Sequence, residues 1–249
     1  MKVKWLGHAA TLITSDSGIR IITDPYQPGY HARPDGILFY SEIKEPADIV
    51  VVSHEHPDHN YVVTIPGNPV IVRGAEIRGK EAITVKGVAF KGVPTLHDDV
   101  GGTLMGENTI TCFEVDGLRI CHTGDIGHVL SDKQVAEIGE VDVLLLLIGL
   151  LKGQGERRFK IDDKGHRIPA PFSAYVIDAD VADRVYEQLG AKVTIPIHYS
   201  NERCSFKLIG IDSFLLEKKN VSRLGVSEVE LIREKLPTES QIVVLRPAL

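Results

Sequence analysis

The sequence has few cysteines, no excess of positive charge and no long hydrophobic run. Its three cysteines, Cys112, Cys121 and Cys204, are widely spaced without a CxxC pair, which is typical of reduced thiols in a cytoplasmic protein. Lys and Arg number 28 against 34 Asp and Glu, and the net charge of −6 argues against a nucleic-acid partner. The longest uncharged apolar run, Val143 to Leu151, is too short to cross a bilayer, so no membrane partner is expected. Gly7 interrupts the N-terminal apolar segment, which makes it a poor signal peptide.

The 249 residues have the composition of a globular protein, 43% hydrophobic and 25% charged, without a repeat or a long linker. We therefore expect a single domain covering 1–249, with α/β layers. Short β-rich runs predict strands at Val3–Leu6, Ala10–Thr14, Ile19–Thr23, Ile49–Val52, Val70–Val72, Ile83–Phe90, Thr109–Val115, Leu118–His122, Val143–Ile148, Val193–Ile197 and Ile242–Leu245. Capping residues and apolar spacing predict helices at Ser131–Ile138, Asp178–Leu189 and Ser227–Leu236.

The most informative segment is Ser53-His54-Glu55-His56-Pro57-Asp58-His59, which follows a predicted buried strand. Neutral imidazole is a common ligand of zinc-like ions, and carboxylate is a harder ligand. His54 and His56 can point to one position, while Asp58 and His59 can face a second. One short loop can therefore supply ligands to two neighbouring ions.

This HxHxDH signature resembles that of the metallo-β-lactamase superfamily, and nearly the whole chain supports the resemblance. The resemblance implies a four-layer αββα sandwich that holds two divalent ions, with Zn²⁺ favoured and Mn²⁺ as the alternative. It also implies which residues ligate the metals: His54, His56, Asp58, His59, His97, Asp125 and His198. Within that set, Asp125 corresponds to the carboxylate that bridges the two ions.

Two N-terminal segments, Trp5 to Ala10 and Ile21 to Pro25, resemble the branch that contains L-ascorbate-6-phosphate lactonase and related metal-dependent hydrolases. N-acylphosphatidylethanolamine phospholipase D has similar patterns there. The resemblance implies that His8 lines the active site and that Asp24 supports the metal loop. The segment from Leu147 to Leu151 departs from the Pro-x-Gly-Gly stretch of many relatives, so the substrate of a relative cannot be assigned to this chain.

The expected activity is that of a metal-dependent hydrolase, in which a metal-activated hydroxide attacks a small ester, lactone or phosphorylated substrate. Asp58 would orient the hydroxide or take its proton, and His8 or Tyr199 would donate a hydrogen bond to the substrate. The basic stretch from Lys152 to Arg167 is either a solvated loop or a lid, and as a lid it would favour an anionic small molecule.

Three alternative functions stay open at this point: a phosphodiesterase of the phospholipase D or nuclease type, an iron redox protein, and a metal-binding module without catalysis. The state of assembly is also open, because the run from Ile242 to Leu245 is either a core strand or the interface of a homo-oligomer.

Overall fold

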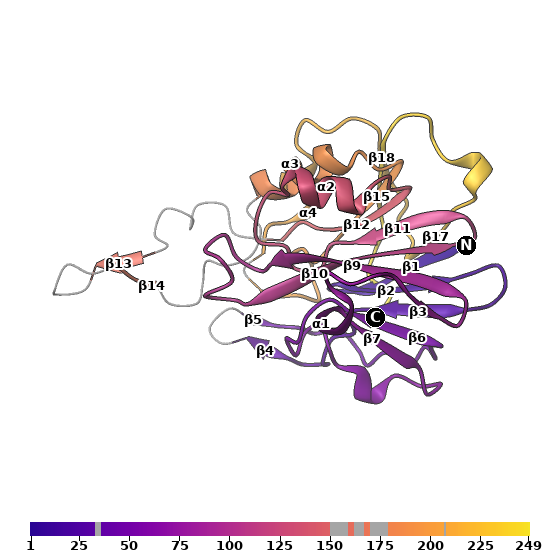
Figure 1. Ribbon diagram of the computed structural model, residues 1–249, viewed down its shortest axis with the longest axis horizontal. Helices are drawn as coiled ribbons and strands as arrows, with labels where there is room; N and C mark the ends of the chain where they lie inside the picture. The colour runs from indigo at the N-terminus through magenta and orange to yellow at the C-terminus, as the bar shows by residue number, and fades with distance from the viewer. Residues whose placement is uncertain (33–35, 150–158, 162–166, 170–178, 207) are drawn as a thin grey trace.

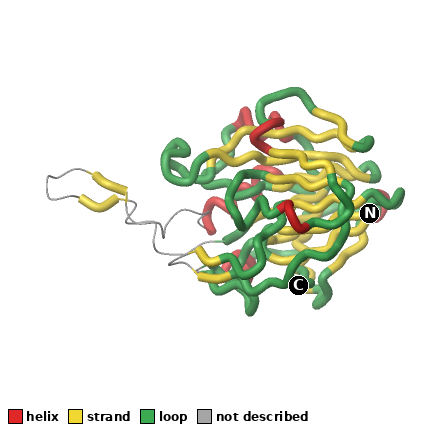
Figure 2. The backbone as a smooth tube through the Cα atoms, turned by 90° about the horizontal axis from the view of Figure 1, so that it is seen from below, coloured by secondary structure: helices red, strands yellow, loops and turns green. Residues whose placement is uncertain are grey.

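The computed structural model describes residues 1–32, 36–149, 159–161, 167–169, 179–206 and 208–249 (Figure 1). Strands dominate this part of the chain, and the helices are short (Figure 2). The basic residues Lys152, Arg157, Arg158 and Lys164 of the predicted loop lie outside the described residues.

Two sheets form the body of the protein. The first contains, in spatial order, β17 (Glu228–Glu230), β1 (Lys2–Gly7), β2 (Ala10–Thr14), β3 (Arg20–Thr23), β6 (Ile49–Val52) and β7 (Val70–Arg73). The second contains β16 (Val221–Arg223), β18 (Gln241–Val244), β15 (Val193–Ile197), β12 (Val143–Leu147), β11 (Leu118–His122), β10 (Glu107–Val115), β9 (Val88–Leu96) and β8 (Ile83–Val85). Two small hairpins are formed by β4 (His31–Ala32) with β5 (Gly36–Ile37) and by β13 (Phe159–Ile161) with β14 (Arg167–Pro169).

The helices are unevenly distributed around the sheets. Those described are α1 (Gly74–Ile77), α2 (Asp132–Ile138), α3 (Ala179–Leu189) and α4 (Ile211–Leu215), with 3₁₀ turns at Val62–Thr64 and Arg233–Lys235. Helices α2, α3 and α4 lie together on the side of the eight-stranded sheet (Figure 1). The outer face of the six-stranded sheet is packed by loop residues such as Tyr26, Tyr40 and Ile43. The expected α/β sandwich is confirmed, but loops make up much of one outer layer.

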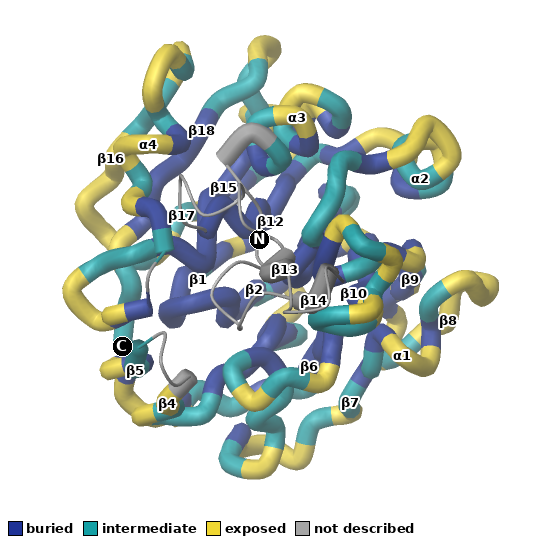
Figure 3. The backbone as a smooth tube through the Cα atoms, turned by 90° about the vertical axis from the view of Figure 1, so that its left-hand side faces the viewer, coloured by how far each residue is buried: buried dark blue, intermediate teal, exposed yellow. Residues whose placement is uncertain are grey.

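Alternation along the central strands of the six-stranded sheet divides their apolar side chains between two clusters. In β6, Ile49 and Val51 belong to the core between the sheets, whereas Val50 and Val52 belong to the cluster on the outer face. Both faces of this strand are therefore buried, as its continuous β-branched sequence predicts. Figure 3 shows the buried central strands surrounded by exposed loops.

Two predicted elements differ from the structure. The predicted helix at Ser227–Leu236 is wrong, because Glu228–Glu230 forms strand β17 and pairs with the lysine-rich start of β1. Cross-strand pairing of Glu228 with Lys4 has overridden the helical spacing. The predicted strand at Ile83–Phe90 is in fact a hairpin, because Lys86 and Gly87 both take positive φ and form its turn.

The structure also shows the state of the C-terminal run, of the cysteines and of the described helices. The Ile242–Leu245 run forms a core strand, since β18 lies between β15 and β16. All three cysteines are free and buried. No helix in the described part of the chain is long and apolar enough to cross a membrane.

Candidate metal centre

Histidines and aspartates gather where the strands of both sheets end. The HxHxDH loop follows β6, His97 follows β9, and His198 follows β15. His8 occupies the turn between β1 and β2, and its carbonyl accepts the backbone N–H of His198 at 2.9 Å. The fold thus brings four distant segments of the sequence to one edge of the sandwich.

One group of possible ligands consists of His54, His56 and His97, whose ring nitrogens lie within 4.8 Å of one another. His54 Nε2 is 3.0 Å from His56 Nδ1. His54 and His97 are buried, and His56 is partly exposed. Three imidazoles that converge in this way form a donor set suited to zinc.

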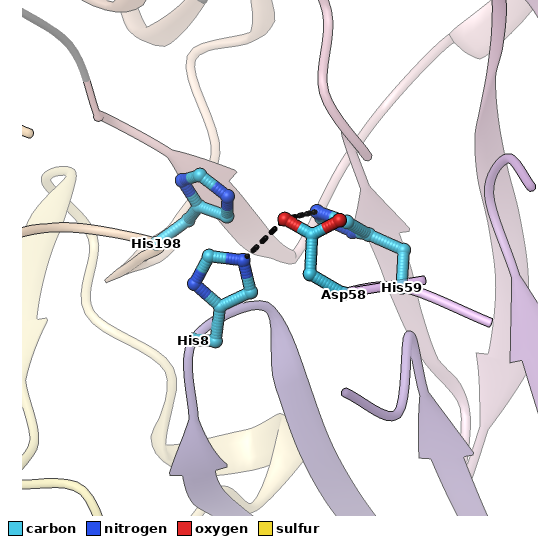
Figure 4. A group of neighbouring side chains, drawn as sticks. All are labelled: His8, Asp58, His59 and His198. Carbon is cyan, nitrogen blue, oxygen red and sulfur yellow. Dashed lines mark hydrogen bonds and ion pairs between the residues drawn. The ribbon is translucent and has the colours of Figure 1, made fainter. Parts of the chain in front are cut away.

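A second group contains His8, Asp58, His59 and His198, again with ligand atoms within 4.8 Å of one another. Asp58 Oδ2 lies between the two rings of His8 and His59, 3.2 Å from the Nε2 of the first and 3.8 Å from that of the second (Figure 4). The ring centroid of His198 is 3.9 Å from that of His8. Figure 4 shows His8 at the tip of its hairpin, facing the carboxylate.

Asp125 connects the two groups. Its Oδ2 lies 3.2 Å from His97 Nε2 in the first group and 3.2 Å from His59 Nε2 in the second. The same oxygen is 3.7 Å from His198 Nε2. One buried carboxylate therefore faces both groups, as expected for a bridging ligand.

Asp24 orients one histidine of each group. Its Oδ2 accepts a hydrogen bond from His59 Nδ1 at 2.9 Å and another from the Ser53 hydroxyl at 2.6 Å. Because the Ser53 proton is donated to Asp24, Ser53 Oγ accepts from His54 Nδ1 at 2.9 Å. Both imidazoles are thereby held with Nδ1 as the donor, so Nε2 is the nitrogen that faces the position of a metal.

Three residues at this edge have left-handed backbone conformations that residues other than glycine seldom adopt. The φ angles are 49° for His8, 37° for Asp24 and 57° for His198. Strain of this kind persists only where the surrounding structure enforces it, and it is concentrated at functional sites.

The electrostatics of the cluster favour ligation. Burial lowers the pKa of His54 and His198 well below the ordinary value, so both rings are neutral. Burial opposes ionisation of Asp58 and Asp125, but the nearby His59 holds the pKa of each carboxyl below its ordinary value. Neutral imidazoles and ionised carboxylates are the forms that bind metal ions, so these four side chains are in the ligating form. His59 differs, because Asp125 and Asp58 outweigh the effect of burial and raise its pKa well above the ordinary value. A metal ion bound there would have to displace a proton from this ring.

Unpartnered buried atoms provide a test of whether divalent ions fit. Among the described residues, His59 Nε2, His198 Nε2 and Asp125 Oδ1 are buried without a hydrogen-bond partner. Buried polar atoms in native proteins are normally satisfied. Cations between the two groups would satisfy these atoms, so the residues fit the metals that the sequence predicts.

Asn108, which no sequence motif indicates, supports the bridging aspartate. Its Oδ1 accepts the backbone N–H of Asp125 at 3.0 Å, and its Nδ2 donates to the carbonyl of Thr123 and the hydroxyl of Thr95. Asn108 is fully buried. The available signal is a polar residue of low β-propensity at the start of a strand.

Tyr199, predicted to contact substrate, does not join the cluster. Its hydroxyl donates to the Leu245 carbonyl at 3.3 Å, and its ring packs against Trp5 with centroids 4.9 Å apart. The aromatic residues next to the cluster are instead Phe206, whose ring centroid lies 5.5 Å from that of His8, and Tyr30, which packs against Phe206.

Two other histidines near the cluster are occupied in hydrogen bonds of their own. His122 accepts the Gly124 N–H and contacts the Ala9 carbonyl at 3.3 Å, in agreement with a packing role. His128 accepts the Leu96 N–H at 3.1 Å and thereby joins the loop that contains Asp125 to the end of β9.

Gly149, in the segment that follows β12, lies directly against the backbone of His198. A Cβ atom at this position would lie 2.2 Å from the His198 carbonyl oxygen. A glycine is therefore needed here for the close approach of this loop to the metal-site histidine.

Comparison with known proteins identifies the family of this chain. Residues 2–198 match the family model of the β-lactamase superfamily domain. The chain belongs to the metallo-β-lactamase superfamily. It is 32% identical to a candidate Zn-dependent hydrolase of this superfamily from Thermotoga maritima, and the match covers 98% of this chain and 97% of that one with a TM-score of 0.69.

Sequence relatives point to the same class of enzyme. A UPF0173 metal-dependent hydrolase from Methanospirillum hungatei is 27% identical over 80% of this chain and 83% of its own length. A protein of the same name from Archaeoglobus fulgidus is 27% identical over 80% of this chain and 84% of its own. The chain is a metal-dependent hydrolase of the superfamily, as the sequence predicts. Its lactonase-like character stays a prediction.

Proposed function

We propose that this enzyme hydrolyses a small ester, lactone or phosphorylated substrate with two divalent ions bound at the cluster. His54, His56 and His97 would hold one ion, and Asp58, His59 and His198 the other, with Asp125 contacting both. The observation that carries the proposal is the position of Asp125 Oδ2, 3.2 Å from a histidine of each group. The histidine-rich donor set favours Zn²⁺, and Mn²⁺ is the alternative.

The bound ions would supply Lewis acidity, lowering the pKa of water and polarising a substrate oxygen. Asp58 would then accept the proton of the attacking water. Its Oδ2 is 3.2 Å from His8 Nε2, so His8 can hold the carboxylate in place or pass a proton to the leaving oxygen. Asp24 would keep His59 in the ligating tautomer throughout.

Elemental analysis of purified protein, before and after chelation, tests the proposal. We expect about two equivalents of zinc or manganese, and loss of activity on nitrophenyl esters, lactones and phosphodiesters after stripping. His97→Ala and His198→Ala should each lose about one equivalent. His31→Ala, which removes an exposed histidine outside the cluster, is the matched control and should keep both.

Asp58 is also proposed to hold an ion, so its role in turnover is tested in variant protein that carries the same metal content as the wild type. Asp58→Asn should lower kcat by about a hundredfold or more while the protein remains folded. Unchanged kcat in this variant would rule out proton transfer by Asp58. Iron with a visible absorption band in the purified protein would instead favour redox chemistry.

A further inference from the structure

A cavity of about 240 Å³ lies beside the HxHxDH loop and is lined there by His54 and His56. Its opposite wall is formed by helix α1 and by the segment that leads into β10, which contribute Arg78, Met105 and Glu107. A ligand in this cavity would contact the first group of possible metal ligands at one end and Arg78 at the other. The cavity is therefore placed to bind the part of a substrate that does not react.

Close backbone contacts fix the position of Arg78. Its N–H donates to the Gly74 carbonyl at 3.0 Å, and its backbone bridges to Gly92 in β9. A Cβ at Gly74 would lie 2.5 Å from the Ser53 carbonyl oxygen, so α1 packs directly against the segment that begins the HxHxDH loop. The guanidinium thus projects from a support that is rigid relative to the metal centre.

The charges in the cavity wall are not equally available to a ligand. The charge of Glu55 is already paired, because it accepts from Arg73 Nη1 at 2.7 and 2.9 Å and from Asn60 Nδ2 at 2.9 Å. Arg78 pairs through Nη2 with Glu107 Oε2, and the Glu107 side chain is 61% exposed against 25% for Arg78. Glu107 can therefore turn into solvent while Arg78 stays in the wall.

We propose that Arg78 binds a carboxylate of the substrate and that Glu107 occupies the same donors until the substrate displaces it. A guanidinium offers five N–H donors in a planar fork that matches carboxylate geometry. Since Glu107 already presents a carboxylate to this fork, a ligand carboxylate replaces it group for group. The substrate is thus an ester or lactone with a carboxylate at the end that does not react. The inference rests on the proposed function in one respect, namely that the reacting carbonyl lies at the metal centre.

Two variants should act in opposite directions on metal-loaded enzyme. The substrates are 4-nitrophenyl hemisuccinate and 4-nitrophenyl butyrate, which differ chiefly in the terminal carboxylate. Arg78→Ala should raise KM for the hemisuccinate about tenfold or more, because a charge-assisted hydrogen bond is lost, and change KM for the butyrate by less than about twofold. Glu107→Gln should lower KM for the hemisuccinate, because the competing charge is removed.

The controls separate substrate binding from a structural role of the pair. Arg20, the first residue of β3, pairs with Asp48 outside the cavity. Arg20→Ala removes this guanidinium and should leave both KM values unchanged. If Arg78→Ala folds poorly, Arg78→Lys replaces it. This variant keeps the charge and should retain part of the discrimination between the two esters. Equal changes for both esters, or weaker hemisuccinate binding in Glu107→Gln, would overturn the proposal.

A binding measurement makes the inference independent of turnover. Calorimetric titration of the zinc-loaded protein with succinamate and with butyramide, which differ chiefly in the terminal carboxylate, should give tighter binding of succinamate in wild type. In Arg78→Ala this preference should be lost. Equal binding of both amides to wild type would refute the carboxylate site. Absence of ester hydrolysis together with a preserved preference for succinamate would overturn the proposed reaction and leave the binding site supported.

Discussion

Replacing Asp24 by asparagine tests whether one buried carboxylate organises both metal sites. Asp24 is fully buried and accepts the Ser53 N–H at 2.7 Å, the Ser53 hydroxyl at 2.6 Å and His59 Nδ1 at 2.9 Å. In the Asp24→Asn variant, the carboxamide oxygen would still accept the backbone N–H. Its NH₂ group would face the other two partners, both of which are donors in the wild type.

The expected magnitude follows from those contacts. Two charge-assisted hydrogen bonds are lost, each worth about 1.5–3 kcal/mol, so the free energy of unfolding of the metal-free protein should fall by about 3–6 kcal/mol. The new amide would also favour the tautomer of His59 with its proton on Nε2, the nitrogen that faces Asp125. Because Ser53 connects Asp24 to His54, both groups should be affected, and zinc affinity at each should fall about 10- to 100-fold.

Three measurements on the same protein test this reasoning. Competition with a chromophoric chelator gives the zinc affinity, urea unfolding gives the stability, and ¹⁵N-resolved imidazole spectra give the tautomers. Asp142→Asn is the matched control, because Asp142 also accepts a backbone N–H, that of Arg119 at 2.8 Å, at the opposite ends of the strands. Lower stability in Asp24→Asn with unchanged zinc affinity and unchanged tautomers would refute the orienting role.

Four further variants have definite expectations. Asn108→Ala should lower kcat and the free energy of unfolding, the latter by about 2–3 kcal/mol, because it leaves buried backbone groups unpaired; activity assays and urea unfolding measure both. Gly149→Ala should weaken zinc binding by displacing His198, which the chelator competition detects. Tyr199→Phe should leave kcat unchanged, and a large loss would restore its predicted contact with substrate. Asp48→Asn removes a carboxylate whose pKa is lowered by the backbone N–H of Arg20 and by nearby cations. The resulting loss of stability should be at most about 1 kcal/mol, because solvent screens this surface group. The loss should be present above the ordinary value of 3.8 and disappear as pH falls through the lower pKa of the folded state, as unfolding near neutral pH and at about pH 2 can test.

The sequence predicts those parts of the site that depend on local pattern. Strand ends are marked by β-branched runs such as Ile49–Val52, and histidine is rare enough that HxHxDH after such a run indicates a metal site. The strands that precede Asp125 and His198 are predicted from the same kind of run. The errors arise where a contact distant in sequence decides the structure. The helical spacing at Ser227–Leu236 is a local pattern, and it carries no information about the partner strand with which part of this segment pairs.

The side chains that orient the ligands could not be predicted in this way, because their function exists only in the folded protein. Asn108 and Asp125 are 17 residues apart and belong to no common motif, yet the Asn108 carboxamide accepts the backbone N–H of Asp125 at 3.0 Å. The Arg78 and Glu107 pair likewise joins α1 to β10 across a cavity that no single segment encloses. Residue types that bind metal directly are chemically restricted and therefore visible in a sequence, whereas the groups that orient them can be almost any polar residue. The same reasoning applies to substrate choice: the metal ligands allow many hydrolytic reactions, so selectivity must lie in wall residues such as Arg78, and variants there should change which substrate is bound without changing the metal content.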